Sequence, residues 1–319
     1  MLYTSANGRS ELTADVRTSS NAHAEDSPGN GAPKESVPAH APVRLSGVWL
    51  WLSMAAAMLA AAGSVVGLSA SDNIYGQETA ALADAVAAQD ITNLVLVAPL
   101  TVALAVLASR GSLAAFLCWL GVLAFTVYNY AIYTLSIHFG PLFLVWVAVL
   151  GMSLFALIGA LGTSDVAAVK TRFSGQAMRV TAWFLIVVAA IFVLLWLSEI
   201  VPDLLAGDPS SSASDWNIPT NPVYVLDLAF FLPAVVVSGV LLLRRHPLGY
   251  VTALGQLSWI ALTCLPILVT PLVAHARGHE PGWAVAGPVG VLFTLTVAVL
   301  LIVLRRLGTE PVPSSDETR

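Results

Sequence analysis

The sequence predicts an all-α fold, a polytopic membrane bundle of eight transmembrane helices, from its composition, its apolar stretches and its distribution of charge. Hydrophobic residues make up 57% of the 319 residues and charged residues 10%, and the mean hydropathy is +0.81. A soluble domain carries about 25% charged residues, so this composition excludes an ordinary soluble domain.

Eight apolar stretches follow one another along the chain, each near the roughly 20 residues that a helix needs to cross a bilayer. They lie at residues 47–69, 91–109, 112–136, 141–162, 178–200, 223–243, 248–272 and 283–304. Lipid offers no partners for backbone N–H and C=O groups, and the stretches lack the alternation of a barrel strand. Each stretch is therefore predicted to be a membrane-spanning helix.

Basic residues gather on one side of this threading. Of the 14 Lys and Arg residues, all but Arg277 lie in the termini or at span ends that face the same side. Short cytoplasmic loops tend to keep Lys and Arg. Both termini are therefore expected to be cytoplasmic, in a multi-pass protein of the cell membrane.

Three regions are predicted along the chain. Residues 1–45 are polar and lack apolar periodicity, so they are expected to form a disordered cytoplasmic tail. Residues 46–305 form the transmembrane domain, with repeat halves at about 46–163 and 177–305, and residues 306–319 form a second tail.

Two loops are long enough to have structure of their own. Residues 78–88 place Ala, Leu and acidic residues at helical spacing, which predicts a short helix on the outer surface. Residues 201–222 are rich in Ser, Gly and Pro and are expected to form an irregular loop at a cavity mouth.

An internal repeat is indicated by three pairs of residues at matching positions. Each half would hold four spans and keep its orientation, so the halves would be parallel repeats about an axis along the membrane normal. Chance resemblance between two apolar helices that end in Arg is the alternative. The aligned pairs are Asn93 with Asp227, Pro99 with Pro233, and Arg110 with Arg244.

Asp227 is the clearest polar residue within a span. It lies five residues beyond Pro222 among apolar neighbours, and a charge at mid-bilayer costs roughly 2.5–3.5 kcal/mol, so it should face the bundle interior or a cavity. A carboxyl group there can donate a hydrogen bond when neutral or carry a proton. Asp227 and Glu199 are therefore the candidate catalytic acids; a bond that only positions a helix is the alternative.

Polar residues on the third and seventh spans recur at helical spacing, which predicts one polar face on each. For Tyr133, a place in the aromatic belt at the membrane interface is the alternative. Asp90 and Asp203 are expected to be solvated interface residues. The predicted ligand-binding residues are Asn93, Asn129, Tyr130, Tyr133, Asp227, Gln256 and Trp259.

Motifs for cofactors, metals and common catalytic mechanisms are not found in the sequence. It lacks a P-loop, a dinucleotide-binding glycine motif, a nucleophile elbow and a CxxC pair, so no cofactor is expected. His275, His279 and Glu280 form an HxxxHE string, but Gly278 and Pro281 disfavour a helix there, so no metal site is expected. No basic run suggests nucleic acid. The expected partners are the lipid bilayer and a small lipophilic ligand.

Two stretches resemble a known family. NPVYVLDLAFFLPAVVV with the following RRHPLGY, and VYNYAIYTLSIHFGPLFLVWVAVLGMSLFALIGAL, are similar to a group of bacterial, largely actinobacterial, multi-pass integral membrane proteins. The resemblance covers roughly residues 47–305 and is most specific near Asp227 and between Tyr133 and Pro141. It implies this topology in a bacterial cell membrane, and it implies no activity.

Three functions fit these observations. We favour a protein that binds or transports a small molecule, ion or lipid through an outward-facing polar cavity around Asp227, formed by the second, third, sixth and seventh spans. The alternative is a membrane-embedded enzyme on an isoprenoid-like substrate, such as a terpene cyclase or isomerase with a carboxylic acid as general acid. A membrane sensor or assembly partner is the third.

Overall fold

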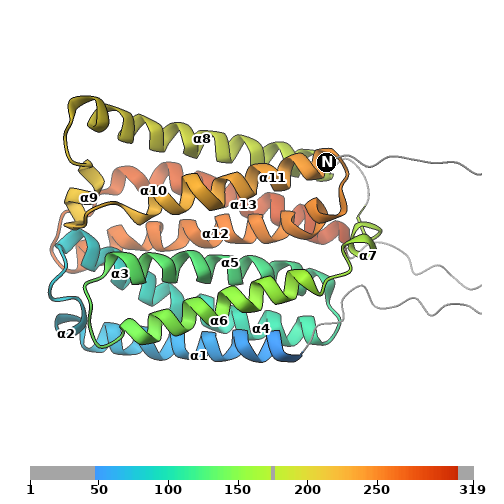
Figure 1. Cartoon of the computed structure of the whole chain (residues 1–319), viewed down its shortest axis with the longest axis horizontal. Helices are drawn as coiled ribbons and strands as arrows, with labels where there is room; N and C mark the ends of the chain where they lie inside the picture. Colours follow the sequence, from blue (N-terminus) through green and yellow to red (C-terminus); the bar gives the residue numbers. More distant parts are fainter. Residues whose placement is uncertain (1–46, 174–176, 308–319) are drawn as a thin grey trace, which may run out of the picture. The chain divides into compact units, whose positions relative to one another are not determined.

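Eight helices in the described part of the chain are long and apolar enough to cross a membrane, which confirms the predicted fold class. The computed structural model describes residues 47–173 and 177–307, and these contain helices and loops but no strand. The predicted tails lie outside the described residues, except that α13 includes the first two residues of the second tail. The helices run side by side as one bundle (Figure 1).

The bundle comprises eight spans and several short helices in the loops. The elements are α1 (Gly47–Ser69), α2 (Ser71–Tyr75), α3 (Ala80–Thr92), η1 (Asn93–Val97), α4 (Ala98–Ser109), α5 (Leu113–Ser136), α6 (Phe143–Gly162), α7 (Val166–Lys170), α8 (Ala177–Ala206), α9 (Ser211–Trp216), α10 (Pro222–Leu226), η2 (Asp227–Phe231), α11 (Leu232–Leu243), α12 (Pro247–Ala276), η3 (Trp283–Val285) and α13 (Ala286–Leu307).

The helix predicted within residues 78–88 is present from Ala80 onward, but its predicted place on the outer surface is wrong. It is the start of α3, which continues through η1 and α4 as one span from Ala80 to Ser109. The Thr79 side chain caps the start of α3 by accepting the Leu82 N–H. Leu82, Asp84 and Val86 are buried in the bundle, so this segment packs inside the protein and not on its surface.

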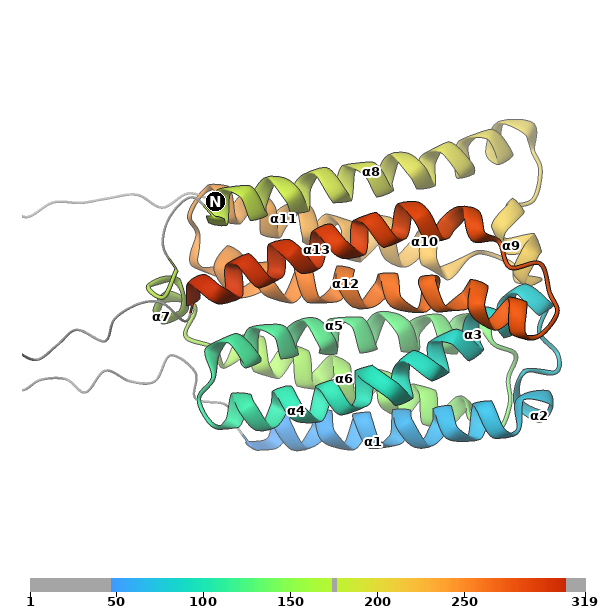
Figure 2. The same ribbon diagram turned by 180° about the vertical axis from the view of Figure 1, so that it is seen from behind.

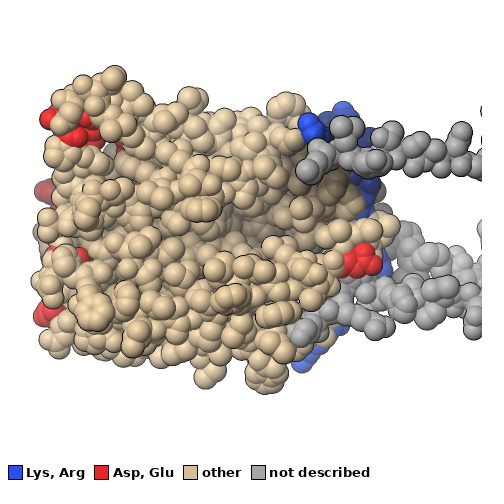
Figure 3. All heavy atoms as spheres, in the orientation of Figure 1, with Lys and Arg blue, Asp and Glu red and all other residues tan. Residues whose placement is uncertain are grey.

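Charged side chains separate to the two ends of the bundle (Figure 3). We call the end with α2, α9 and η3 the acidic end, because most Asp and Glu residues lie there, and the end with α7 the basic end. Arg277 follows α12 and is the one described Arg or Lys at the acidic end. The apolar middle of the bundle therefore lies between two polar ends of unlike charge.

Two π-helical turns occur at matching places in the second and sixth spans. In η1 the N–H of Ala98 donates to the carbonyl of Asn93, and in η2 the N–H of Leu232 donates to the carbonyl of Asp227. A proline, Pro99 or Pro233, lies two residues after the end of each turn and lacks the N–H that a regular helix uses. Such wide turns are frequent at functional sites, and here each begins at a buried polar residue.

The spans α5 and α12 cross in close contact at two glycines. A Cβ atom on Gly121 would overlap the Gly255 carbonyl oxygen and the Ser258 Cβ atom. Gly121 and Gly255 are 134 positions apart, as are the two residues that begin the π-helical turns. Small residues let membrane helices approach closely, so this crossing joins the two sets of four spans at the centre.

The two sets of four spans differ in how their outer helices pack. Helix α1 packs along α6, whereas α8 and α13 touch at few positions. Both ribbon views show α8 at one edge of the bundle, diverging from its neighbours α10 and α11 toward the acidic end (Figures 1 and 2). The outer helices of the second set, α8 and α13, are therefore less closely packed than the corresponding helices of the first set, α1 and α6.

Substitution of Gly121 tests the central crossing. We expect Gly121→Ala to lower the free energy of unfolding by about 1–3 kcal/mol, because the added methyl group overpacks the contact with Gly255. Gly151→Ala is the control, because a Cβ atom there meets open space. Thermal unfolding of the purified variants in detergent measures both. Equal midpoints for the two variants would contradict the close crossing.

Candidate functional site

A cavity of about 310 Å³ lies between the two sets of spans. Its walls come from α3 and α5 on one side and from α8, α10, α11, α12 and α13 on the other. Trp216, the last residue of α9, and Asn221, in the loop that follows, line the cavity at the acidic end. The α12 residues that line it run from Trp259, near the middle of that helix, to Thr270, nearer the acidic end. The cavity therefore lies toward the acidic end of the bundle.

Asp227 is the acidic residue in the cavity wall. It is 5% exposed, and its Oδ2 atom accepts a hydrogen bond of 2.8 Å from the indole N–H of Trp196 on α8. Tyr128 on α5 interacts with the same carboxyl group. The Oδ1 atom is buried and has no hydrogen-bond partner among the described residues. One oxygen of the carboxyl group is therefore satisfied by Trp196, and the other is buried in the cavity wall without a hydrogen-bond partner in the described structure.

Aromatic rings pack around Tyr128, which interacts with this carboxyl group. Tyr128 packs edge-on against Phe231 with ring centroids 4.8 Å apart, and against Trp259 at 5.5 Å. Phe231 and Trp259 stack at 5.1 Å. The indole N–H of Trp259 is also buried without a partner in the described structure. The cavity thus combines an apolar wall, aromatic faces and two unsatisfied polar groups.

The structure brings together some of the predicted ligand-binding residues and separates others. Asn129, Tyr133, Asp227 and Trp259 line the cavity. The other predicted site residues do not line it: Asn93 and Tyr130 line a second cavity of about 10 Å³, and Gln256 and Glu199 line neither.

The rotation of each helix and the position of each residue along it explain why these predicted residues do not line the cavity. The cavity face of α5 carries Tyr128 and Ile132, so Tyr130 points to the other side of the helix. Gln256 lies on the basic side of Trp259, beyond the end of the cavity. Glu199 is exposed and accepts a hydrogen bond from Tyr224. These residues are therefore not part of the cavity site.

Hydrogen bonds between amide side chains join η1, which carries Asn93, to α5, which carries Asn129. Gln89 donates to the Asn93 Oδ1 atom at 2.9 Å, and Asn129 donates to the same atom at 3.5 Å. The Asn93 Nδ2 atom has no partner among the described residues. Asn93 thus occupies the place in η1 that Asp227 occupies in η2, but its oxygen is already used within the protein.

Asp90 is not the solvated interface residue that the sequence suggested. It is 1% exposed, and its carboxylate accepts hydrogen bonds from Ser64 at 2.8 Å, Tyr75 at 2.7 Å and Tyr133 at 3.0 Å. Burial, and then the charge of Asp90, raise the pKa of Tyr75 well above its usual value, so this phenol remains a donor. A Cβ atom on Gly67 would overlap this group, so the glycine admits the contact. Asp90 ties α1, α2, α3 and α5 together.

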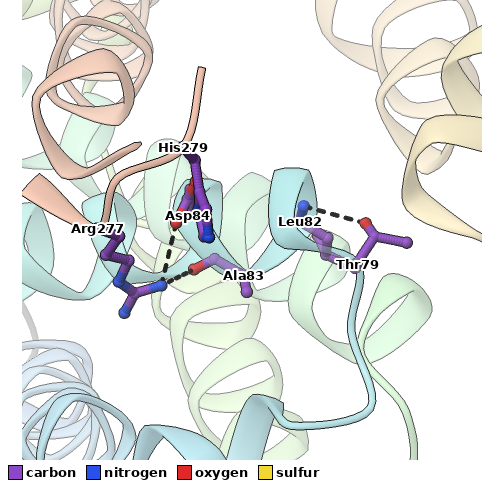
Figure 4. Close-up of polar contacts among 6 residues, drawn as sticks. All are labelled: Thr79, Leu82, Ala83, Asp84, Arg277 and His279. Carbon is purple, nitrogen blue, oxygen red and sulfur yellow. Dashed lines mark hydrogen bonds and ion pairs between the residues drawn. The ribbon is translucent and has the colours of Figure 1, made fainter. Parts of the chain in front are cut away.

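Asp84 makes a second polar junction, between α3 and the loop after α12 (Figure 4). Its carboxylate lies 3.2 Å from a guanidinium nitrogen of Arg277 and 2.7 Å from Nδ1 of His279. Arg277 also donates to the Ala83 carbonyl. In the HxxxHE string, His279 thus pairs with Asp84, and among residues 47–173 and 177–307 no three His, Cys, Asp or Glu residues cluster as metal ligands.

Two residues of the cavity, Trp196 and Tyr128, were missed from the sequence. Trp196 lies on an almost wholly apolar helix, where a Trp is typical of a lipid-facing or core position. Tyr128 belongs to the same aromatic run as Tyr130 and Tyr133 and lies on a different face of the helix. Both are identified by their contact with Asp227, which sequence periodicity does not report.

Removal of one phenol tests the Asp90 junction. We expect Tyr75→Phe to lower the free energy of unfolding by about 1–3 kcal/mol, because it leaves a buried carboxylate oxygen without its donor. Tyr224→Phe is the matched control and should cost less than about 1 kcal/mol, because water can replace the phenol at exposed Glu199. Thermal unfolding of both variants measures the difference; an equal loss in the two would show that Asp90 is hydrated.

The chain was compared with protein-family models, curated proteins and solved structures, and none of them matches. The family resemblance seen in the sequence stays a prediction. What the protein does is therefore inferred from the cavity and its residues.

Proposed function

We propose that the protein binds a small, largely apolar molecule in the cavity beside Asp227 and moves it across the membrane. The observation that carries this proposal is the Asp227 Oδ1 atom, which is buried in the wall of a 310 Å³ cavity and has no partner in the described structure. A buried polar atom that lacks a partner is unfavourable, so a ligand that supplies one would bind with a gain of free energy. Ligand sites are commonly apolar cavities with a few such polar groups.

The packing of α8 and α13 supports an access route for this molecule. Both helices contribute to the cavity wall, and they touch each other at few positions. The corresponding outer helices of the first set, α1 and α6, pack closely and leave a second cavity of only about 10 Å³. A lipophilic molecule could therefore enter between α8 and α13 from the bilayer or from the acidic end.

A parallel repeat would explain how such a site is exposed to both sides. Arg110 and Arg244, 134 positions apart, both end helices, and Gly111 and Arg245 after them both have positive φ angles. Related halves can rock against each other around a central site. The close contact of the halves at Gly121 and Gly255 would be the pivot of this movement in the proposed transporter.

The enzyme alternative has one observation in its favour. Rings of Tyr128 and Trp259 lie in the same cavity as Asp227, and aromatic faces stabilise a carbocation. In that mechanism Asp227 would protonate a neutral polyprenyl substrate. Turnover of such a substrate by the wild type and not by Asp227→Asn would select this function over transport.

A cavity-filling substitution tests the binding function. Val289 on α13 lines the cavity, and Val291 on the same helix is 61% exposed. We expect Val289→Phe to weaken binding of the neutral probe 1-adamantanol at least about tenfold, because the ring occupies its volume, and Val291→Phe to leave binding unchanged. Calorimetry on the purified chain in phosphatidylcholine nanodiscs measures both affinities. If both variants bind like the wild type, the probe does not occupy this cavity.

Cysteine labelling tests the proposed orientation in the bacterial membrane, with both termini cytoplasmic. In a chain with both native cysteines replaced by Ala, we expect Glu280→Cys to react with an impermeant maleimide in intact cells, because it lies at the acidic end. Arg172→Cys, in the loop after α7 at the basic end, should react only after permeabilisation. The reverse pattern would place the basic end outside, against the usual retention of Lys and Arg.

A further inference from the structure

The buried acids of the bundle differ in how completely the protein satisfies them. Asp90 accepts three hydrogen bonds from its own chain, and Asp84 is paired with Arg277 and His279. Asp227 accepts a hydrogen bond from Trp196 and interacts with Tyr128, and its Oδ1 atom has no hydrogen-bond partner in the described structure. The protein can therefore satisfy a buried carboxylate, and at Asp227 it leaves one oxygen unsatisfied in the wall of a cavity.

The charge of the cavity wall restricts what can approach that oxygen. None of the described residues that line the cavity is Lys, Arg or His, and Asp227 is its one acidic residue. An anionic ligand would meet the carboxylate without a compensating charge, whereas a cation would neutralise it in an apolar site. An N–H donor on that cation would also complete the hydrogen bonding of Oδ1.

The rings beside Asp227 favour the same kind of ligand. Tyr128 and Trp259 line the cavity at right angles to each other, with Phe231 against both. Trp196 brings a fourth ring to the other carboxylate oxygen. Aromatic faces attract ammonium groups, and a carboxylate together with several rings is a common way to bind them.

We propose that the ligand of this cavity is a lipophilic cation, an ammonium group on a bulky apolar skeleton, bound through Asp227 and the rings of Tyr128 and Trp259. This inference rests on the proposed function and names its substrate class. The apolar walls hold the skeleton, and the carboxylate holds the charge. The free indole N–H of Trp259 offers a donor to any oxygen that the ligand also carries.

Three probes with one skeleton and different charges test the ligand class. The full chain is placed in phosphatidylcholine nanodiscs, which add no net lipid charge, and is titrated at neutral pH with 1-adamantylammonium, 1-adamantanol and 1-adamantanecarboxylate; empty nanodiscs are the blank. We expect the cation to bind at least about tenfold more tightly than the alcohol, and the anion to bind weakest. Equal binding of cation and alcohol would overturn the ligand class and leave the cavity function standing. If none of the probes binds the wild type, both proposals fail.

Two variants test whether Asp227 causes the preference for the cation. Asp227→Asn removes the charge and keeps an oxygen for Trp196, so it should lose the preference for the cation while 1-adamantanol still binds. Asp208→Asn removes the same charge from an exposed position in the loop before α9 and should change nothing. A cation preference that survives Asp227→Asn would overturn the role of this residue. Retained binding of 1-adamantanol shows that the Asp227→Asn variant is folded. If this variant binds no alcohol, the proposal is tested with Trp259→Leu in the wild-type background. That variant must weaken binding of the cation more than binding of the alcohol for the proposal to hold.

Discussion

A carboxyl group inside an apolar bundle requires a partner, and this requirement organises the structure. Water is scarce there, and an unpaired charge costs several kcal/mol. Asp84 is matched by a guanidinium and an imidazole, which explains why Arg277, the one described Arg or Lys at the acidic end, lies where it does. Asp90 is matched by three hydroxyl groups from three other helices. These two junctions hold the acidic end of the first four spans together and attach the loop after α12 to it.

The contacts between spans are of two kinds, and they act in different layers. In the middle of the bundle, lipid gives little drive for apolar helices to associate, so close packing at small residues such as Gly121 and Gly255 takes that role. Toward the acidic end, polar junctions hold α3 to its neighbours, including a hydrogen bond from Thr79 to the Asp215 carbonyl on α9. Between the two layers, α8 and α13 contact each other little, and the cavity occupies that space. The cavity therefore lies between a layer of close packing at small residues and a layer of polar junctions.

The sequence is sufficient to predict the eight spans, because length and apolarity decide whether a helix can cross lipid. It also selects Asn129, Tyr133, Asp227 and Trp259, which line one cavity, because polar and aromatic residues stand out within apolar spans. It fails where burial is decided by a distant partner: Asp90 looks like a solvated helix end until Ser64, Tyr75 and Tyr133 are placed around it. The same limit applies to Tyr130 and Tyr128, because the rotation of α5 is set by the helices on both sides of it and periodicity alone does not reveal which face meets the cavity.

The π-helical turns show why the polar site lies in one half of the proposed repeat and not in both. Each turn begins at a buried polar residue six positions before a proline. In η1 that residue is an amide, and Gln89 and Asn129 use its oxygen to join two helices. In η2 it is a carboxyl group with one oxygen bound to Trp196 and one free, beside a space that the first half lacks. The same backbone feature thus has two different surroundings: in η1 the polar side chain joins two helices, and in η2 one carboxyl oxygen stays without a partner in the described structure, which is where the proposed ligand would bind.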